Sequence, residues 1–82
     1  MKVKTLLKRL EGLNIPYAIE DVNGYNKDVL FTINETNFKA GFIEGREEVE
    51  DFCRPIYFNQ VSQQMVNRFF RNFKELLRYA YV

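Results

Sequence analysis

Apolar positions recur along the chain with two different periods, which separate predicted helices from predicted strands. In residues 3–13 they recur at steps of three and four, which places them on one side of a helix. In residues 15–22, 29–33 and 38–43 they recur at steps of two, as in strands with one buried face. Short polar links rich in Asn and Gly separate these strands. The first half of the chain is therefore predicted to form a helix and a three-stranded antiparallel meander.

The second half is predicted to be mainly helical. Residues 46–53 form a predicted short helix whose first turns carry acidic side chains, where the helix dipole favours negative charge. Pro55 interrupts this helix, and residues 56–58 form an apolar link or a short fourth strand. Asn59 is typical of an N-cap and precedes a predicted long helix over residues 60–80. The apolar residues of that helix fall on one broad side: Val61, Met65, Val66, Phe69, Phe70, Phe73, Leu76, Leu77 and Ala80.

The predicted order of elements is αβββαα. Each amphipathic element must bury its apolar side against another element, and the simplest arrangement packs both long helices on one face of the meander. The sequence thus predicts an α+β fold in one domain over residues 1–82. We expect a two-layer sandwich built from a three-stranded antiparallel meander, an N-terminal helix, a short helix and a long C-terminal helix.

Composition excludes several classes of function. The chain has 82 residues, of which 46% are apolar and 28% charged, as in a globular protein of one domain. It has no His and one Cys, which excludes the familiar zinc sites and the Cys–His or Ser–His catalytic pairs. Cys53 is in phase with the inward positions Val49 and Phe52, which predicts a buried, inert thiol. We expect no catalytic residues, no cofactor and no metal.

The single Cys and the N-terminal segment bear on location. One Cys cannot form a disulfide within the chain, which suits a reducing cytoplasm. Charged residues interrupt the first ten positions, unlike the apolar run of a signal peptide. No stretch reaches the ~20 apolar residues that span a bilayer. We therefore expect a cytoplasmic protein with no membrane contact.

The formal net charge of +1 hides an uneven distribution. Residues 1–10 carry four basic and no acidic side chains, residues 11–66 have a net charge of −6, and residues 67–82 have a net charge of +3. Two basic ends therefore flank an acidic centre. Such zones bear on partners and self-association rather than on the fold.

Two charged surfaces are candidate contact sites, and each also has a purely structural interpretation. The basic side of the predicted long helix is either a solvated helix face or a stripe that binds phosphate groups; it consists of Arg68, Arg71, Lys74 and Arg78. The acidic stretch around Glu47, Glu48 and Asp51 is either a solvated face or a partner contact, and far less often a metal site. Tyr25, in the Asn-Gly link, either joins this acidic surface or folds back over the sheet.

The predicted order of elements resembles two kinds of protein. The α-β-β-β-α order over nearly the full chain resembles the double-stranded RNA-binding domain, which implies RNA binding. That family clamps phosphates with a Gly- and Lys-rich loop before its last helix, whereas residues 59–64 here contain no Lys or Arg. The order, the size and a composition rich in Asn, Lys, Phe, Tyr and Ile also resemble small phage inhibitors, including some anti-CRISPR proteins. This resemblance implies a protein that occupies a surface of a host enzyme.

The leading prediction is a small non-enzymatic binding protein, encoded by a phage or mobile element, that binds and inhibits a host protein or protein–nucleic-acid complex. The alternative is a nucleic-acid-binding domain that uses the basic face of the C-terminal helix. A third interpretation is a homo-oligomer with Phe58, Tyr79 and Tyr81 at the contact.

Overall fold

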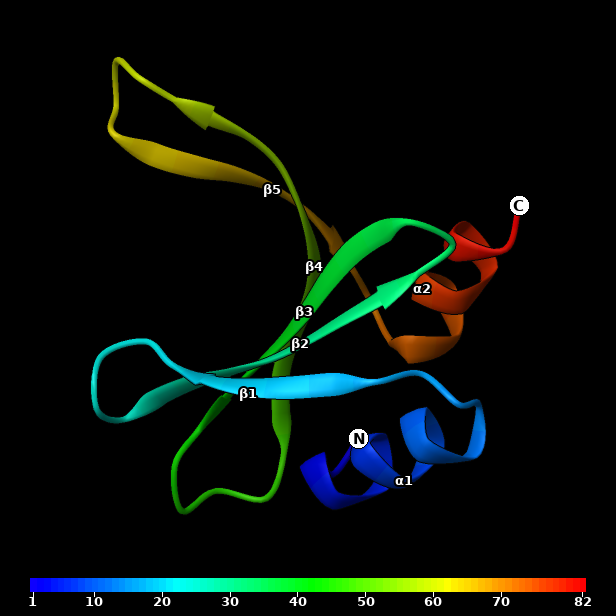
Figure 1. Cartoon of the computed structure of the whole chain (residues 1–82). Coiled ribbons are helices and arrows are strands. Elements are labelled where there is room, and N and C mark those ends of the chain that lie inside the picture. The colour runs from blue at the N-terminus through cyan, green and yellow to red at the C-terminus, as the bar shows by residue number, and fades with distance from the viewer.

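Five consecutive strands form one antiparallel sheet in the order of the chain, and a helix lies near each end of the sequence (Figure 1). The computed structural model describes all 82 residues. Each strand pairs with the next, so the whole sheet is a meander. The elements are α1 (Val3–Gly12), β1 (Tyr17–Asp21), β2 (Asn26–Ile33), β3 (Thr36–Ile43), β4 (Val49–Asn59), β5 (Gln64–Phe70) and α2 (Phe73–Ala80). Neither helix has the length and apolar character needed to cross a membrane.

Both helices bury their apolar sides in a single core. Leu6 and Leu10 of α1 and Leu76 of α2 are completely buried. The guanidinium carbon of Arg9 lies 5.4 Å from the centre of the Phe73 ring, so the two helices meet at that ring. The sheet adds the residues of one face: Val29, Phe31, Ile33, Phe38, Ala40, Phe52 and Phe70. The alternate residues form the opposite, open face of the sheet, which includes Ala18, Asp28, Leu30, Lys39, Gly41, Asp51, Cys53, Asn67 and Phe69.

The prediction of three strands followed by a long helix over residues 60–80 is wrong. The chain reverses at Gln63, where φ is 57°, and returns as β5 beside β4. Only Phe73–Ala80 is helical. The apolar residues of the strand segment 64–70 stand at positions 65, 66, 69 and 70, so they recur at steps of three and four, as in a helix, and do not alternate. Pairing with β4 overrides this local pattern, and this pairing joins segments that a local pattern does not connect.

The two Asn side chains near these boundaries show how the prediction failed. Asn59 does accept hydrogen bonds from backbone N–H groups, those of Val61 and Ser62 at 3.0 and 3.2 Å, but it does so in the turn between two strands. The helix begins at Asn72, whose Oδ1 accepts from the N–H of Glu75 at 2.9 Å. The same residue type thus supports a turn at one site and a helix start at the other.

The predicted short helix over residues 46–53 is also wrong. The chain leaves a turn at Gly45, where φ is 85°, and enters β4, which includes the apolar link 56–58. The carbonyl of Glu47 accepts from the N–H of Val3 at 2.6 Å. The segment is therefore held by the N-terminus of the chain and by its pairing with β3 instead of by helical bonds to itself. The observed order is αβββββα, which differs from the order on which both resemblances were based.

Candidate functional site

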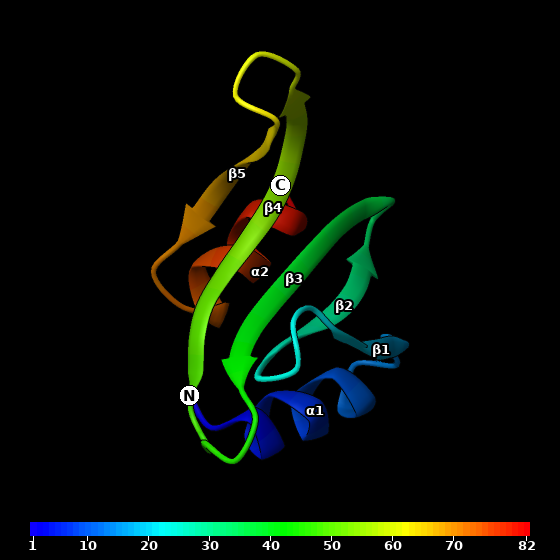
Figure 2. The ribbon, with the colours of Figure 1, turned by 90° about the vertical axis from the view of Figure 1, so that its left-hand side faces the viewer.

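The outer parts of β4 and β5 leave the body of the protein as a two-stranded ribbon, called the arm and defined as residues 55–67 (Figures 1 and 2). The pairing of β3 with β4 ends at the pair Lys39–Cys53, so the arm strands pair only with each other. The arm has no charged residue, and Arg54 and Arg68 face each other across its base. Five of its large apolar side chains are exposed: Ile56, Tyr57, Phe58, Val61 and Met65.

Local features of β4 explain why the arm can separate from the sheet. Pro55 donates no ladder hydrogen bond, and it stands two residues past the last pair with β3, where β4 has become an edge. A bulge at Ile56 shifts the pairing of β4 with β5. At the tip, the turn leaves Val61 97% exposed. Because the consecutive residues Tyr57 and Phe58 are both about half exposed, neither face of the ribbon is covered.

Two arginines contact Tyr79 where the arm meets the body, and two more line the same hollow as Tyr79. They are called the arginine cluster and consist of Arg54, Arg68, Arg71 and Arg78. Arg54 donates to the hydroxyl of Tyr79 at 3.0 Å, and the guanidinium carbon of Arg68 lies 4.4 Å from the centre of the same ring. A hollow of 310 Å³ beside β5 is lined by Arg68, Arg71, Glu75, Arg78, Tyr79 and Val82.

Little of the positive charge of this cluster is neutralised within the chain. Arg71 is paired with Glu75, with 3.3 Å between Nε and Oε2. Hydrogen bonds from the backbone and side chain of Arg71 hold the pKa of Glu75 below its ordinary value. No carboxylate lies within 4.0 Å of a guanidinium nitrogen of the other three arginines. The hollow therefore presents three arginines and one paired carboxylate, that of Glu75, and this excess of positive charge suits carboxylates or phosphates.

The four basic residues predicted to line one helix face do not do so. Arg68 is on β5, Arg71 is in the turn that follows, and only Lys74 and Arg78 are on α2. The hydrogen-bonded turn still brings Arg68, Arg71 and Arg78 to one hollow, whereas Lys74 is exposed and does not line it. The prediction thus named three residues that the structure brings together, with the wrong secondary structure between them.

The predicted acidic surface is divided in the structure. Glu48 binds the terminal ammonium group at 3.2 Å, and Glu47 lies 3.6 Å from the amine of Lys2. Asp51 is on the open face of the sheet, where it accepts from the N–H of Gly41. Tyr25 is 76% exposed in the link between β1 and β2. These side chains do not line a common hollow.

The aromatic residues predicted for self-association are also apart. Phe58 is on the arm, and Tyr81 is 56% exposed after the end of α2. Tyr79 packs against Phe38 and Phe70, with ring centroids 6.3 and 5.2 Å apart, beneath the arginine cluster. Tyr79 is therefore a support of that cluster more than a free contact residue.

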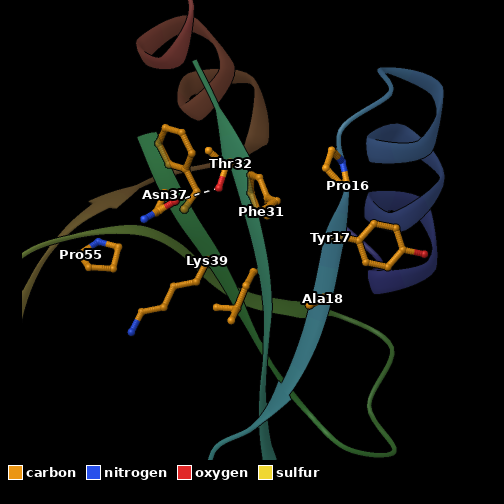
Figure 3. Close-up of a pocket in the computed structure, with 10 residues that line it drawn as sticks. Pro16, Tyr17, Ala18, Phe31, Thr32, Asn37, Lys39 and Pro55 are labelled. Atoms are coloured by element: carbon orange, nitrogen blue, oxygen red, sulfur yellow. Dashed lines mark hydrogen bonds between the residues drawn. The ribbon is translucent and has the colours of Figure 1, made fainter. Parts of the chain in front are cut away.

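The open face of the sheet has two shallow hollows that share Lys39. The larger, of 560 Å³, forms where β4 turns away from β3, and its lining includes Pro16, Ala18 and Pro55 (Figure 3). The second, of 430 Å³, includes Asp28, Asp51, Cys53 and Phe69. Lys39 is the only charged residue of the larger hollow. These hollows are wide and open and have no arrangement of reacting groups.

The titratable groups of the open face do not form a catalytic or metal-binding set. Burial raises the pKa of Cys53 to about 11, and Asp51 and Asp28 add to this effect, while Lys39 opposes it. Burial also raises the pKa of Asp28 above its ordinary value. No group of three His, Cys, Asp or Glu side chains is placed to hold a metal ion. A thiol with a raised pKa is a poor nucleophile at neutral pH.

Sequence reasoning missed the arm and the role of Arg54. The signal was present in the sequence, because residues 55–67 form an uncharged segment between Arg54 and Arg68 in a chain of which 28% of all residues are charged. Such a segment, with Tyr, Phe, Ile and Met among amides, is unusual for a solvated surface. A helical period assigns the apolar residues of this segment to a core, so it does not predict an exposed arm.

Comparisons with known proteins do not add to this description: the chain matches no protein family, no curated protein and no solved structure.

Proposed function

We propose that this chain is a non-enzymatic binding protein that acts by stoichiometric contact with another macromolecule through the arm. The observation that carries the proposal is the projection of an uncharged ribbon with five exposed large apolar side chains. A two-stranded hairpin is marginally stable on its own in water, and contiguous exposed apolar surface is typical of interaction sites. A partner that covers the arm would remove this surface from water.

The chemistry of the arm supports a protein partner. Tyr57, Phe58 and Met65 belong to residue types that are enriched in the buried centres of protein interfaces. Without a charged residue, the arm offers no counter-ion for a phosphate backbone. An apolar groove on a protein surface can bury these side chains, whereas a polyanion cannot.

Size and composition support an origin in a phage or mobile element, with binding that inhibits a host protein or protein–nucleic-acid complex. The chain is short and rich in Asn, Lys, Phe, Tyr and Ile, as in the small phage inhibitors of anti-CRISPR type that the sequence resembles. The order of elements no longer contributes to that resemblance, so this part of the proposal rests on size and composition.

Photo-crosslinking tests the proposal directly. A benzophenone amino acid replaces Phe58 on the arm, or Tyr25 as the matched control, since both are exposed aromatic positions. Tyr25 is in the β1–β2 link, at the other end of β2 and β3 from the direction in which the arm extends. In an extract of the source cells, we expect one protease-sensitive crosslinked product from position 58 and none from position 25. Crosslinking from position 25 alone, or no product from position 58, would contradict the arm as the contact.

Nucleic-acid binding is a second candidate, favoured by the three arginines without a carboxylate partner beside the arm. It predicts affinity for a random DNA or RNA duplex that falls steeply with salt. Arg78→Glu should weaken this affinity, whereas Lys74→Glu, the same charge change on the same helix but outside the hollow, should weaken it less. A mobility-shift assay at low salt that detects no complex removes this candidate.

A further inference from the structure

β5 is an edge strand that nothing in the chain protects. It is the last strand in the sheet, and none of the backbone hydrogen bonds outside the helices and the strand ladders involves residues 64–70. Its seven residues include no Pro, no Lys and no acid. The bulge of the β4–β5 pair lies on β4. Natural edge strands are normally interrupted by such features because an open edge pairs with other chains.

The strand at the opposite edge of the sheet, β1, has features that protect it from pairing with another chain. β1 is five residues long and is preceded by Pro16. It carries Glu20 and Asp21, and Asp21 is held 3.1 Å from the amine of Lys27. Short length, a proline and charges are three of the usual devices against edge pairing. β5 is longer, contains no proline and carries Arg68 as its only charged residue, so β5 is the less protected of the two edges and is open for a partner.

The two sides of β5 differ in chemistry. On the side of the helices, Arg68 points over Tyr79 and lines the 310 Å³ hollow with Arg71 and Arg78. On the side of the open face, Phe69 is 62% exposed. A strand placed beside β5 would direct alternate side chains to these two sides. Acidic residues would meet the arginines, and apolar residues would meet Phe69.

We propose that the partner contributes an extended segment of alternating acidic and apolar residues that adds as a sixth strand to the edge of β5. This inference deepens the proposed function and rests on it, because it names the chemistry and the mode of binding at the base of the arm. Main-chain hydrogen bonds to β5 supply affinity, and the arginine hollow supplies selection for carboxylates.

Two other occupants fit less well. A nucleic acid has no peptide ladder to pair with the open backbone of β5, and the uncharged arm beside it offers nothing to phosphates. A second copy of the chain could pair β5 with β5, but antiparallel pairing would bring both copies of Arg68, Arg71 and Arg78 to one interface with no acid beyond the two copies of Glu75, each already paired with Arg71. Charge complementarity therefore favours an acidic strand from a different protein.

The test selects peptides from a random library of dodecapeptides displayed on phage, against the immobilised full chain. We expect enriched peptides that alternate acidic with apolar residues and that bind with one peptide per chain. Hydrogen exchange should show new protection of backbone amides in residues 64–70. Arg78→Glu should weaken binding about tenfold, while Lys74→Glu, the matched control outside the hollow, should change it by less than about twofold.

Each other outcome contradicts the inference. Failure to enrich any peptide, enriched peptides without acidic residues, or protection on the open face instead of β5 would overturn strand addition. A dimer of the full chain in light scattering that competes with the peptide would assign the edge to a second copy. The crosslinking experiment distinguishes this inference from the proposed function. If position 58 gives a crosslinked product but β5 has no role, only strand addition is contradicted. If position 58 gives no product, the arm is not the contact.

Discussion

The guanidinium carbon of Arg68 lies 4.4 Å from the centre of the Tyr79 ring, so a side chain of the edge strand is seated on the C-terminal helix. The hydroxyl of Tyr79 accepts a hydrogen bond from Arg54, and its ring packs against Phe38 and Phe70. Tyr79 thus joins the core, the base of the arm and the arginine cluster. This residue explains how arginines from two strands can stand side by side without an acidic partner.

Two substitutions of Tyr79 separate its hydroxyl from its ring. Tyr79→Phe keeps the stacking but leaves Arg54 without its acceptor, and we expect it to lower the free energy of unfolding by about 1 kcal/mol. Tyr79→Leu also removes the ring contacts with Arg68 and the core, and the loss should reach about 2–3 kcal/mol. Urea titration followed by circular dichroism measures both. Equal losses for the two variants would mean that the ring does not support the cluster.

Substitution of Asn59, at the end of β4, and of Asn72, before α2, tests the boundaries of these two elements. Asn72→Ala removes the N-cap of α2 and should lower the free energy of unfolding by about 1 kcal/mol. Asn59→Ala affects only the arm turn, so its effect should appear as faster amide exchange at Val61 and Ser62 with a smaller change in global stability. A larger global loss for Asn59→Ala than for Asn72→Ala would contradict this boundary.

The pKa directions of Asp28 and Glu75 predict pH effects of opposite sign. Burial raises the pKa of Asp28 above its ordinary value of 3.8. The stabilising effect of the protonated carboxyl is therefore complete below pH 3.8 and is lost as the pH rises through the pKa of the folded state. Arg71 lowers the pKa of Glu75, so its contribution is present above 4.5 and is lost as the pH falls through the folded-state value.

From about pH 3 to pH 7, Asp28→Asn should therefore gain stability relative to the natural chain, and Glu75→Gln should lose stability relative to it. Urea unfolding at several pH values gives both comparisons. The prediction fails if the two differences change with pH in the same direction.

The buried thiol gives a reporter of opening at the base of the arm. The pKa of Cys53 rises from 9.0 to about 11, so at pH 8 its thiolate population is about a hundredfold below that of the unfolded chain. We expect iodoacetamide to react at least that much more slowly with the native chain than with the chain in urea. The control is Val61→Cys in a Cys53→Ser background, whose exposed thiol should react at nearly the unfolded rate. A native Cys53 that reacts like the control would show that β4 and β5 open there.

Local patterns could predict the N-terminal helix and the strands up to Ile43, because these segments alternate or repeat within themselves. They predict a helix in residues 60–70, since Val66, Phe69 and Phe70 recur at steps of three and four, and only the long-range pairing with β4 makes residues 64–70 a strand. One local signal was available and missed: Asn72 followed by Glu75 three residues later is typical of a helix start. That start divides the predicted long helix at Asn72 and leaves only the residues after it in α2.

The candidate site was predictable in part. The charges of Arg68, Arg71 and Arg78 marked a basic surface whatever the secondary structure between them, and the hollow brings these three together. The contribution of Arg54 depends on the pairing of β4 with β5, and the exposure of Phe58 depends on where β3 ends. Both are long-range relationships that composition and spacing do not contain.

We propose that the arm binds a partner instead of forming part of the core. The most direct measurement compares the amount of partner that is captured by Tyr57→Ser/Phe58→Ser with that captured by the control Tyr25→Ser/Tyr81→Ser. All four positions are exposed aromatics, and both variants should keep the free energy of unfolding within about 1 kcal/mol of the natural chain. We expect the arm variant to lose the partner that is crosslinked from position 58 and the control to retain it. Full capture by an equally stable arm variant would show that the arm is not the contact.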